Sequence, residues 1–405
     1  MNATARDTAD EPGDAPAEPP RVVRWRRAVV LGLRSAWRGA AELEVRISDP
    51  DGSTRTARAL CYPALTGVPS AGQEVLLNTT ALDRGLGTGG YALVVAPGGP
   101  LPADPPPAPG HLVKARYTPL QPMLLGVDDQ ECEHHETMAA AEDLDAMPVV
   151  VADLHSALPA ILAGVRERGP GLRVAYAMTD GGALPLWFSK AVAGLREAGW
   201  LCGAISVGQA FGGDLEAVTL HSGLLAARHV LGADVCVVAQ GPGNLGTGTP
   251  FGFSGVAVGE AVNAIDLLGG RAVACLRVSG ADPRERHLGV SHHSLTAYGR
   301  VALRPADVVV PELDEVDPAL ARRVRAQAAA LAECPAGHRM VSMDVTGLDE
   351  VLASSPVRLS TMGRGLVEDP AAFLAAAAAG RHAGDLALAR TRSPGGGAHQ
   401  NRNGT

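Results

Sequence analysis

The chain has 405 residues, of which 46% are hydrophobic and 19% charged, so it is long enough for two domains that each bury a core. Its formal net charge of -8 argues against a protein coated by nucleic acid or spread on an anionic membrane. Six scattered cysteines without a CxxC pair suit a reducing interior, and no apolar run is long enough to span a membrane. We therefore expect a soluble, cytoplasmic protein.

The first quarter of the chain predicts a tail and then a small β-barrel. Residues 1–20 are short of large hydrophobic side chains and should form a disordered tail. Residues 21–95 carry short apolar runs at 27–33, 41–47, 55–60, 74–77 and 91–95, and Asp49-Pro50-Asp51-Gly52 is a hairpin signal between two of them. Several short strands in about 75 residues favour a barrel.

A proline-rich linker at 96–110 precedes an α/β domain that we place at 111–391, followed by a second disordered tail at 392–405. Buried strands are predicted at 148–152, 173–177, 203–207, 234–239, 271–278, 307–310 and 338–344. Helices are predicted at 131–141, 157–168, 184–198, 214–231, 255–268, 292–302 and after Asp369, and two short strands at 111–116 and 123–127. This alternation is typical of a three-layer α/β domain with a mostly parallel sheet.

The loop after residues 235–239 is the most unusual stretch, with glycines at 241, 243, 246, 248, 252 and 255. Gly241-Pro242-Gly243-Asn244-Leu245-Gly246 matches GxGxxG, but no helix opens at once and no acid ends the next strand, which argues against a dinucleotide fold. Two alternatives stay open. The loop either donates backbone N–H groups to an anion, at Gly241, Gly243, Asn244, Gly246 and Thr247, or is a wide structural turn.

The segment 282–293 is the densest polar loop, and three histidines fall within seven positions of it. Arg284 and Arg286 could clamp a phosphate or carboxylate, while His287 and His292 could transfer protons or bind a metal. The alternative is a solvated salt-bridge loop. Because His292 and His293 are neighbours on a predicted helix, we expect at most one of them to point into a site.

Three other loops follow predicted strands and contribute candidate residues. Asp180, ahead of two glycines, is a candidate catalytic acid or base, whereas Asp214 could bind a ligand or simply cap a helix. His155 is a candidate ligand contact, with its neighbour Ser156 more typical of a helix cap. In a parallel sheet such loops meet at the carboxyl edge of the strands, so we expect them to share one pocket.

Two further patterns suggest other chemistry. Residues 131–136 have the sequence ECEHHE, in which His135 and Glu136 are candidate metal ligands. The HExxH spacing is missing, and an exposed helix start explains the run as well. Arginines and tryptophans at 24–27, 34, 37 and 38 resemble a nucleic-acid-binding β surface, but charges that block strand-edge pairing explain them more simply.

The chain resembles a bacterial family named only as domain of unknown function 3866. The resemblance rests on stretches such as LLNTTALDRGLGTGGYALVV, LRVAYAMTDGGALP, GPGNLGTGTPFGFSG and DPRERHLGVSHHSLT, between about residues 42 and 302. It implies the two-part architecture and carries no reaction, cofactor or catalytic residue.

Our leading hypothesis is that the α/β domain binds a small anionic molecule, such as a phosphorylated metabolite or nucleotide. The first alternative is a metal-dependent hydrolase that uses His287, His292 or His293. The second is a non-enzymatic regulator that binds nucleic acid or protein through the barrel. The sequence leaves open whether the protein is an enzyme, which cofactor it needs and whether it forms a homo-oligomer.

Overall fold

The structure, a computed structural model, describes residues 21–87, 89–101 and 103–392. The tails predicted at 1–20 and 392–405 lie outside the described residues, except for Arg392, which ends the last helix. The described residues divide into two compact units. The first contains residues 21–34, 42–60 and 69–101, and the second contains 35–41, 61–68 and the chain from 103 onward.

The N-terminal strands form the predicted barrel, and this barrel is closed. The strands are β1 (Trp25–Trp37), β2 (Ala40–Ser48), β3 (Thr54–Cys61), β4 (Glu74–Asn78) and β5 (Ala92–Pro97), in the order β1-β2-β3-β5-β4. Strand β5 runs antiparallel to β4 but parallel to β3. Alternating apolar side chains such as Val30, Leu43 and Leu77 are almost wholly buried, because the closed sheet turns one face inward. The short helices α1 (Pro63–Thr66) and η1 (Leu82–Arg84) follow β3 and β4.

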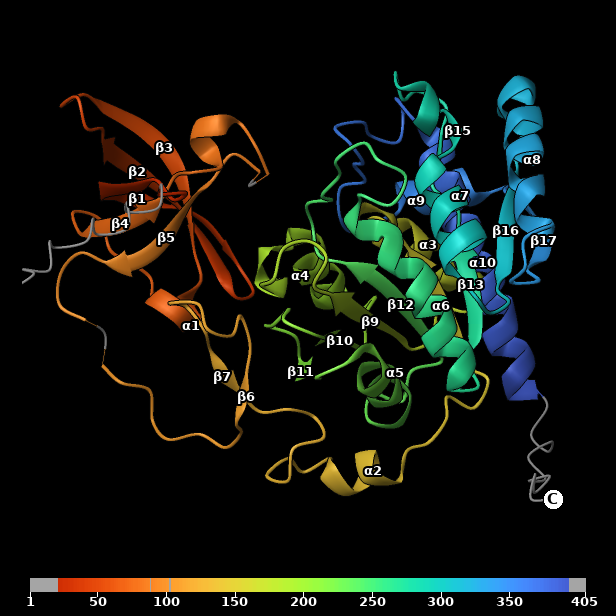
Figure 1. Cartoon of the computed structure of the whole chain (residues 1–405), viewed down its shortest axis with the longest axis horizontal. Coiled ribbons are helices and arrows are strands. Elements are labelled where there is room, and N and C mark those ends of the chain that lie inside the picture. The colour runs from red at the N-terminus through yellow and green to blue at the C-terminus, as the bar shows by residue number, and fades with distance from the viewer. Residues whose placement is uncertain (1–20, 88, 102, 393–405) are drawn as a thin grey trace, which may run out of the picture. The chain divides into compact units, whose positions relative to one another are not determined.

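An eight-stranded, all-parallel sheet forms the core of the second unit (Figure 1). Its order is β11-β10-β9-β12-β8-β13-β16-β17. The strands are β8 (Pro148–Ala152), β9 (Val174–Thr179), β10 (Gly203–Ser206), β11 (Leu215–Glu216), β12 (Val235–Gln240), β13 (Arg271–Cys275), β16 (Asp307–Glu312) and β17 (Arg339–Asp344). Every residue of β8 and β12 is buried, since the central strands of such a sheet are covered on both faces. The predicted α/β fold is confirmed.

Helices cover the two faces of this sheet. On one face lie α3 (Leu158–Arg168), α9 (Leu348–Ala353) and α10 (Pro370–Arg392), and on the other lie α5 (Leu220–His229), α6 (Ala257–Leu267) and α8 (Pro318–Ala332) (Figure 1). Helices α3 and α10 touch at Gly164 and Gly380, where an added Cβ would stand 1.9 Å from a carbonyl oxygen of the other helix. Small residues therefore let the two backbones pack directly, which explains a core with few aromatic side chains.

Several predicted boundaries were wrong. The helix predicted at 214–231 begins only at Leu220, because Leu215–Glu216 pair with β10 as the edge strand β11. The strand predicted at 271–278 stops at Cys275, and Val278–Ser279 pair instead, as β14, with β15 (Gly289–Val290). The helix predicted at 292–302 is α7 (His292–Thr296) followed by the π-helix η6 (Ala297–Val301).

The remaining elements are short or were not predicted. Helix α8 was not predicted at all, and the helix predicted at 131–141 is only α2 (His135–Ala140). The strands expected at 111–116 and 123–127 shrink to the two-residue pair β6 (Leu112–Val113) and β7 (Met123–Leu124). The others are η2 (His155–Ala157), η3 (Leu186–Phe188), α4 (Lys190–Glu197), η4 (Ser254–Val256) and η5 (Glu285–His287). Within the described residues, every helix is too short or too polar to cross a bilayer.

Candidate functional site

The chain reverses its direction across the sheet at β8, and this reversal creates a crevice at the carboxyl edge. The loop after β8 leads to α3 on one face, whereas its neighbours β12 and β13 lead to α6 and α7 on the other. Connections that diverge in this way leave an open space between them, and ligands of open α/β sheets bind at such positions. The loops after β8, β12 and β13 are therefore candidates for a binding site.

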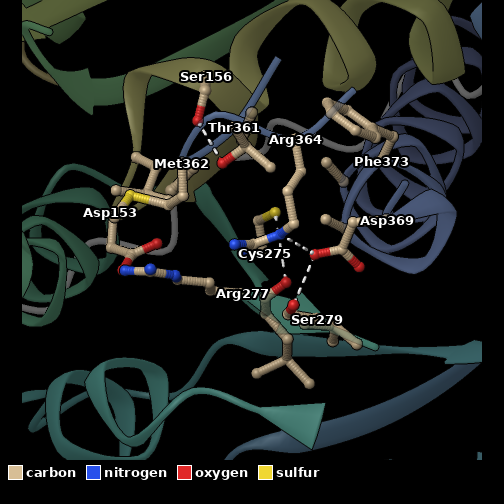
Figure 2. Close-up of a pocket in the computed structure, with 17 residues that line it drawn as sticks. Asp153, Ser156, Cys275, Arg277, Ser279, Thr361, Met362, Arg364, Asp369 and Phe373 are labelled. Atoms are coloured by element: carbon tan, nitrogen blue, oxygen red, sulfur yellow. Dashed lines mark hydrogen bonds and ion pairs between the residues drawn. The ribbon is translucent and has the colours of Figure 1, made fainter. Parts of the chain in front are cut away.

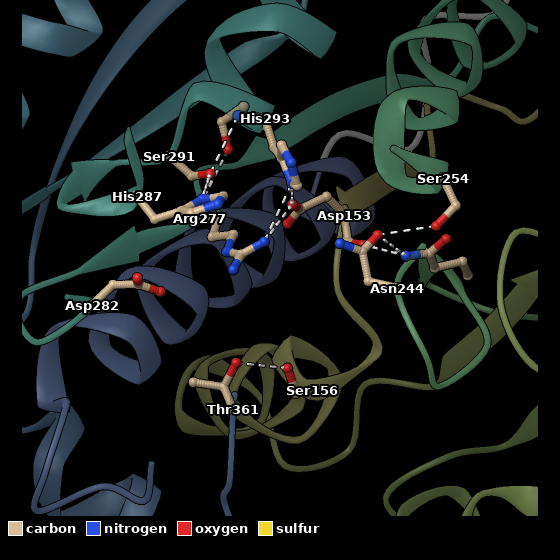
Figure 3. Close-up of polar contacts among 12 residues, drawn as sticks. Asp153, Ser156, Asn244, Ser254, Arg277, Asp282, His287, Ser291, His293 and Thr361 are labelled. Carbon is tan, nitrogen blue, oxygen red and sulfur yellow. Dashed lines mark hydrogen bonds and ion pairs between the residues drawn. The ribbon is translucent and has the colours of Figure 1, made fainter. Parts of the chain in front are cut away.

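Asp153 occupies the centre of this crevice, directly after β8 (Figure 3). Its Oδ2 lies 3.6 Å from Arg277 Nη1 and 3.6 Å from His293 Nδ1, and those two nitrogens are 3.3 Å apart. Burial alone would raise the pKa of Asp153, but the neighbouring His293 and Arg277 outweigh it and lower that pKa. Asp153 is thus a buried carboxylate, and its Oδ2 makes no hydrogen bond within the described part of the chain.

Three histidines lie next to this carboxylate. One ligand nitrogen from each of His287, His292 and His293 falls within 4.8 Å of the others, and the ring centroids are 4.4 to 5.0 Å apart. We call this group the His triad. His287 Nδ1 lies 2.8 Å from the Oγ of Ser291, which also caps α7, and His292 Nε2 is buried without a hydrogen-bond partner among the described residues.

The expectation that only one of His292 and His293 faces a site was wrong. Helix α7 begins at His292, so both residues belong to its first turn, and both rings reach the same space. The hairpin of β14 and β15 returns the chain and places His287 beside them. The ring of Phe253 stacks on His293 at 3.8 Å and holds it in place.

The surroundings of His287 and His292 favour the neutral form of these two imidazoles. Burial, followed by the charge of Arg277, lowers the pKa of His287 to about 3. Burial and the neighbouring His293 also lower the pKa of His292, with Arg286 adding to the effect. An imidazole with such a pKa is a weak base near neutral pH, but a neutral ring nitrogen is what a metal ion requires.

The glycine-rich loop after β12 packs against the same crevice. Gln240 Nε2 donates both to the backbone oxygen of Asp153 and to Asn244 Oδ1, which also accepts from Ser254 Oγ. Gly241 is required for packing, because its Cβ would stand 2.3 Å from the oxygen of Ala183. Gly246 and Thr247 lie exposed farther along, and Thr247 bonds to the loop itself through the oxygen of Gly252.

A pocket of about 350 Å³ opens where the glycine-rich loop meets the segment before α10. Its wall includes Gly243, Asn244, His155 and the exposed Arg358. The backbone N–H groups of Gly243 and Asn244 donate no hydrogen bond to any residue that the structure describes. A small molecule fits this volume, and free N–H groups beside a guanidinium suit an anion.

A second, smaller cavity lies between the end of β8 and the start of α10, and ion pairs of the protein itself close it (Figure 2). Arg364 bonds to Asp369 at 3.1 Å and to Asp282 at 3.3 Å, and Ser279 Oγ donates to Asp369 at 2.5 Å. Both carboxylates are nearly inaccessible to solvent. This network joins the start of α10 to β14 and the loop that follows it, and its charges are paired with one another.

The two arginines predicted to bind an anion differ in whether their charge is already paired within the protein. Arg284 makes a two-pronged ion pair with the adjacent Asp282, at 2.9 and 2.8 Å, so its guanidinium is already engaged. Arg286 is exposed, and its charge reaches His292. Of the two, Arg286 is free to meet an incoming anion.

Three other predicted residues lie away from the triad. Asp180 accepts from the backbone N–H of Gln209, and Asp214 accepts from that of Ala204 while pairing with Arg196, both on the side of β10. His155 lies between Tyr176 Oη at 3.0 Å and Ser189 Oγ at 2.7 Å.

His155 predicts how stability depends on pH. Burial lowers its pKa to about 4, against 6.5 for an exposed imidazole. Below pH 6.5 the unfolded chain therefore takes up a proton that the folded chain refuses, so stability falls as the pH drops toward 4. Urea unfolding should show a loss of up to about 1.4 kcal/mol per pH unit from this residue, which His155→Gln should remove. An equal slope in both proteins would contradict the assignment.

The arginines of the barrel are mostly paired with carboxylates. Arg26 bonds to Asp49 at 3.0 Å, and Arg34 lies 3.3 Å from Glu42, which is almost fully buried. Arg24 and Arg27 also have acidic partners, Asp83 and Glu74. Such pairing lowers the positive charge offered to nucleic acid, so strand-edge charge remains the simpler explanation.

Sequence reasoning missed Asp153, Arg277 and Arg358. Asp153 had a usable signal, since it directly follows a fully apolar strand, as Asp180 nearly does. Arg277 was read as the end of a strand. Arg358 lies outside any pattern and is brought to the pocket only by the fold.

A family model described as "Protein of unknown function (DUF3866)" matches residues 58–380, a range that includes every residue of the crevice. No curated protein and no solved structure matches the chain.

Proposed function

The chain belongs to the family described as "Protein of unknown function (DUF3866)", and we propose that it is a metal-dependent hydrolase that acts on a small anionic substrate. The observation that carries this proposal is the His triad beside Asp153. Three protein ligands and one open position are typical of catalytic zinc sites.

The state of the triad supports metal binding. The low pKa values of His287 and His292 favour their neutral form, and one nitrogen, His292 Nε2, is buried without a partner among the described residues. A buried polar atom without a hydrogen bond is unfavourable by about 1–3 kcal/mol, and a metal ion would remove that penalty. Ser291 holds His287 through its other nitrogen, as outer-shell partners of metal-bound histidines do.

The charges around the triad support hydrolysis of an anion. His287, His292 and His293 would hold the metal ion, which would supply a Lewis acid able to activate a water molecule for hydrolysis. Asp153, ionised and with Oδ2 free of hydrogen bonds, would accept the proton that this water loses. Arg277 and Arg286 would stabilise negative charge as it develops on the substrate.

The glycine-rich pocket supports an anionic group on the substrate, such as a phosphate. Gly243 and Asn244 would supply N–H groups, and Arg358 a countercharge. Gln240 links Asn244 to Asp153, so this pocket adjoins the triad. The glycine-rich loop would thus bind the anion as the sequence suggested, but Arg358 would supply the positive charge first assigned to Arg284. Arg284 is already paired with Asp282.

The test is metal analysis combined with a panel of phosphate esters. Protein purified without chelators should contain zinc or another transition metal and should hydrolyse at least one ester. Asp153→Asn should keep the triad metal and lose activity by about 100-fold or more, because it removes the base. Asp314→Asn, an exposed carboxylate paired with Arg325, serves as the control and should be fully active.

Either of two results would refute the proposal. One is that the triad takes up no transition metal even when zinc is supplied. The other is that Asp153→Asn, with its fold verified by circular dichroism, hydrolyses the ester as fast as the natural protein.

Binding of an anion without turnover is the second candidate, and the pocket of Arg358 favours it. In that case phosphorylated metabolites should raise the melting temperature in protein stripped of metal. Arg358→Ala should abolish the rise.

A further inference from the structure

We propose that His111, Asp129 and Glu131 form a second metal site, which stabilises the fold and takes no part in catalysis. One ligand atom of each residue lies within 4.8 Å of the others. None of these residues belongs to the His triad or to the glycine-rich pocket. The metal ligands suggested at residues 131–136 are thereby revised, since His135 is not part of this cluster and its Nδ1 bonds to the oxygen of Asp128.

The backbone holds these ligands in position. Glu131 Oε2 accepts from the N–H of Gly110 at 2.9 Å, and Asp129 Oδ2 accepts from the N–H of His111 at 3.3 Å. Gly110 has φ of +102°, and a Cβ there would stand 2.5 Å from the Cα of Leu125, so only glycine fits. A chain fixed at Gly110 also fixes the direction from which His111 approaches the carboxylates.

Asp129 is the observation that points to a ligand. Its side chain is 4% exposed, and its Oδ1 is buried with no hydrogen-bond partner in the part of the chain that the structure describes. His111 Nδ1 lies 3.1 Å from Oδ2 and so satisfies only that oxygen. An ion pair between His111 and Asp129 therefore leaves Oδ1 unsatisfied and Glu131 without a cation, whereas a metal ion would bind all three.

The donor set indicates the class of metal. One imidazole with two carboxylates suits zinc or manganese, and water molecules on the exposed side of His111 would complete the shell. Calcium and magnesium prefer oxygen ligands alone.

The position of the site indicates its role. The segment that bears Asp129 is joined to the sheet, since Val127 N donates to the oxygen of Glu216 on edge strand β11. A metal at His111 and Asp129 would therefore tie the chain entering the second unit to the segment that covers this edge. Because it closes a loop of the unfolded chain, such a link adds stability.

The experiment measures zinc stoichiometry and melting temperature in the full chain, with zinc chloride as the only added metal. The natural protein should bind two equivalents, one at each site. Asp129→Asn, which keeps an oxygen for the N–H of His111, should bind one equivalent and lose a zinc-dependent rise of a few degrees in melting temperature. His111→Ala should give the same result, because its exposed ring can be removed without disturbing the packing.

Matched controls separate this site from the triad. Glu133→Gln removes a nearby carboxylate that is 87% exposed and should leave both zinc equivalents in place. His287→Ala should lose the other equivalent and keep the one at Asp129, so failure at the triad leaves this proposal intact. Unchanged stoichiometry in both Asp129→Asn and His111→Ala would overturn it.

Discussion

Replacement of His292 by alanine is expected to weaken zinc binding at the triad by more than about 100-fold. Loss of an outer-shell partner costs metal affinity about 10–100-fold, and loss of a direct ligand should exceed that range. Titration against a competing chelator would measure the effect, in protein that also carries Asp129→Asn so that only one site is observed. The two changes lie on separate segments of the chain and should act independently.

Variants that should weaken zinc binding by different amounts test this prediction further. Ser291→Ala removes the hydroxyl that contacts His287 Nδ1, so it should weaken zinc by about 10-fold, less than loss of a ligand. His221→Ala changes an exposed histidine on α5 and should bind zinc as the natural protein does. A triad that keeps its affinity after His292→Ala would not be a metal site.

Replacement of Lys114 by methionine is expected to destabilise the second unit by about 3–5 kcal/mol. Lys114 is fully buried, and its Nζ donates to the oxygens of Ser206 and Ala210 and to Glu216 Oε2, at 2.8 to 2.9 Å. Burial lowers the pKa of Lys114 and raises that of Glu216, and each residue's charge opposes the shift in its partner's pKa. Without the lysine, a buried carboxylate loses its cation. The midpoint of guanidinium unfolding should fall accordingly.

Two comparisons test the physical reason. Lys114→Met combined with Glu216→Gln should recover part of the loss, because no unpaired charge remains buried. Arg116→Met removes an exposed charge two residues away and should change stability by less than about 0.5 kcal/mol. If the double variant is no more stable than Lys114→Met, the cause is lost packing and not the orphaned carboxylate.

The elements that the sequence predicted well are those whose residues are apolar throughout. Strand β8 matches its prediction at 148–152 residue for residue, because a strand buried on both faces appears as an unbroken apolar run. Helix α8 was missed because only one side of it is buried and its polar residues resemble a loop. Strand β11 was predicted as helix because its two residues are held by pairing with β10, which leaves no local pattern.

The residues of the candidate site were likewise predicted only in part. The three histidines within seven positions pointed to His287 and His292 as site residues. The expectation that neighbouring helix residues face different ways excluded His292 and His293 from one site, whereas the structure brings their rings together. Asp180 was preferred over Asp153, although both follow strands. Their contacts distinguish them, since Asp153 lies beside Arg277 and His293. Asp180 instead accepts from the backbone N–H of Gln209.

The sequence by itself determined the two-part architecture and the residue types available for chemistry, because hydrophobic periodicity and turn residues act locally along the chain. Which polar residues meet was decided only by the tertiary structure. Strand order set Asp153 beside Arg277, and the pairing of β14 with β15 returned the chain so that His287 lies beside α7. The first contact joins residues far apart in the chain, and the geometry of both depends on packing that no local pattern encodes.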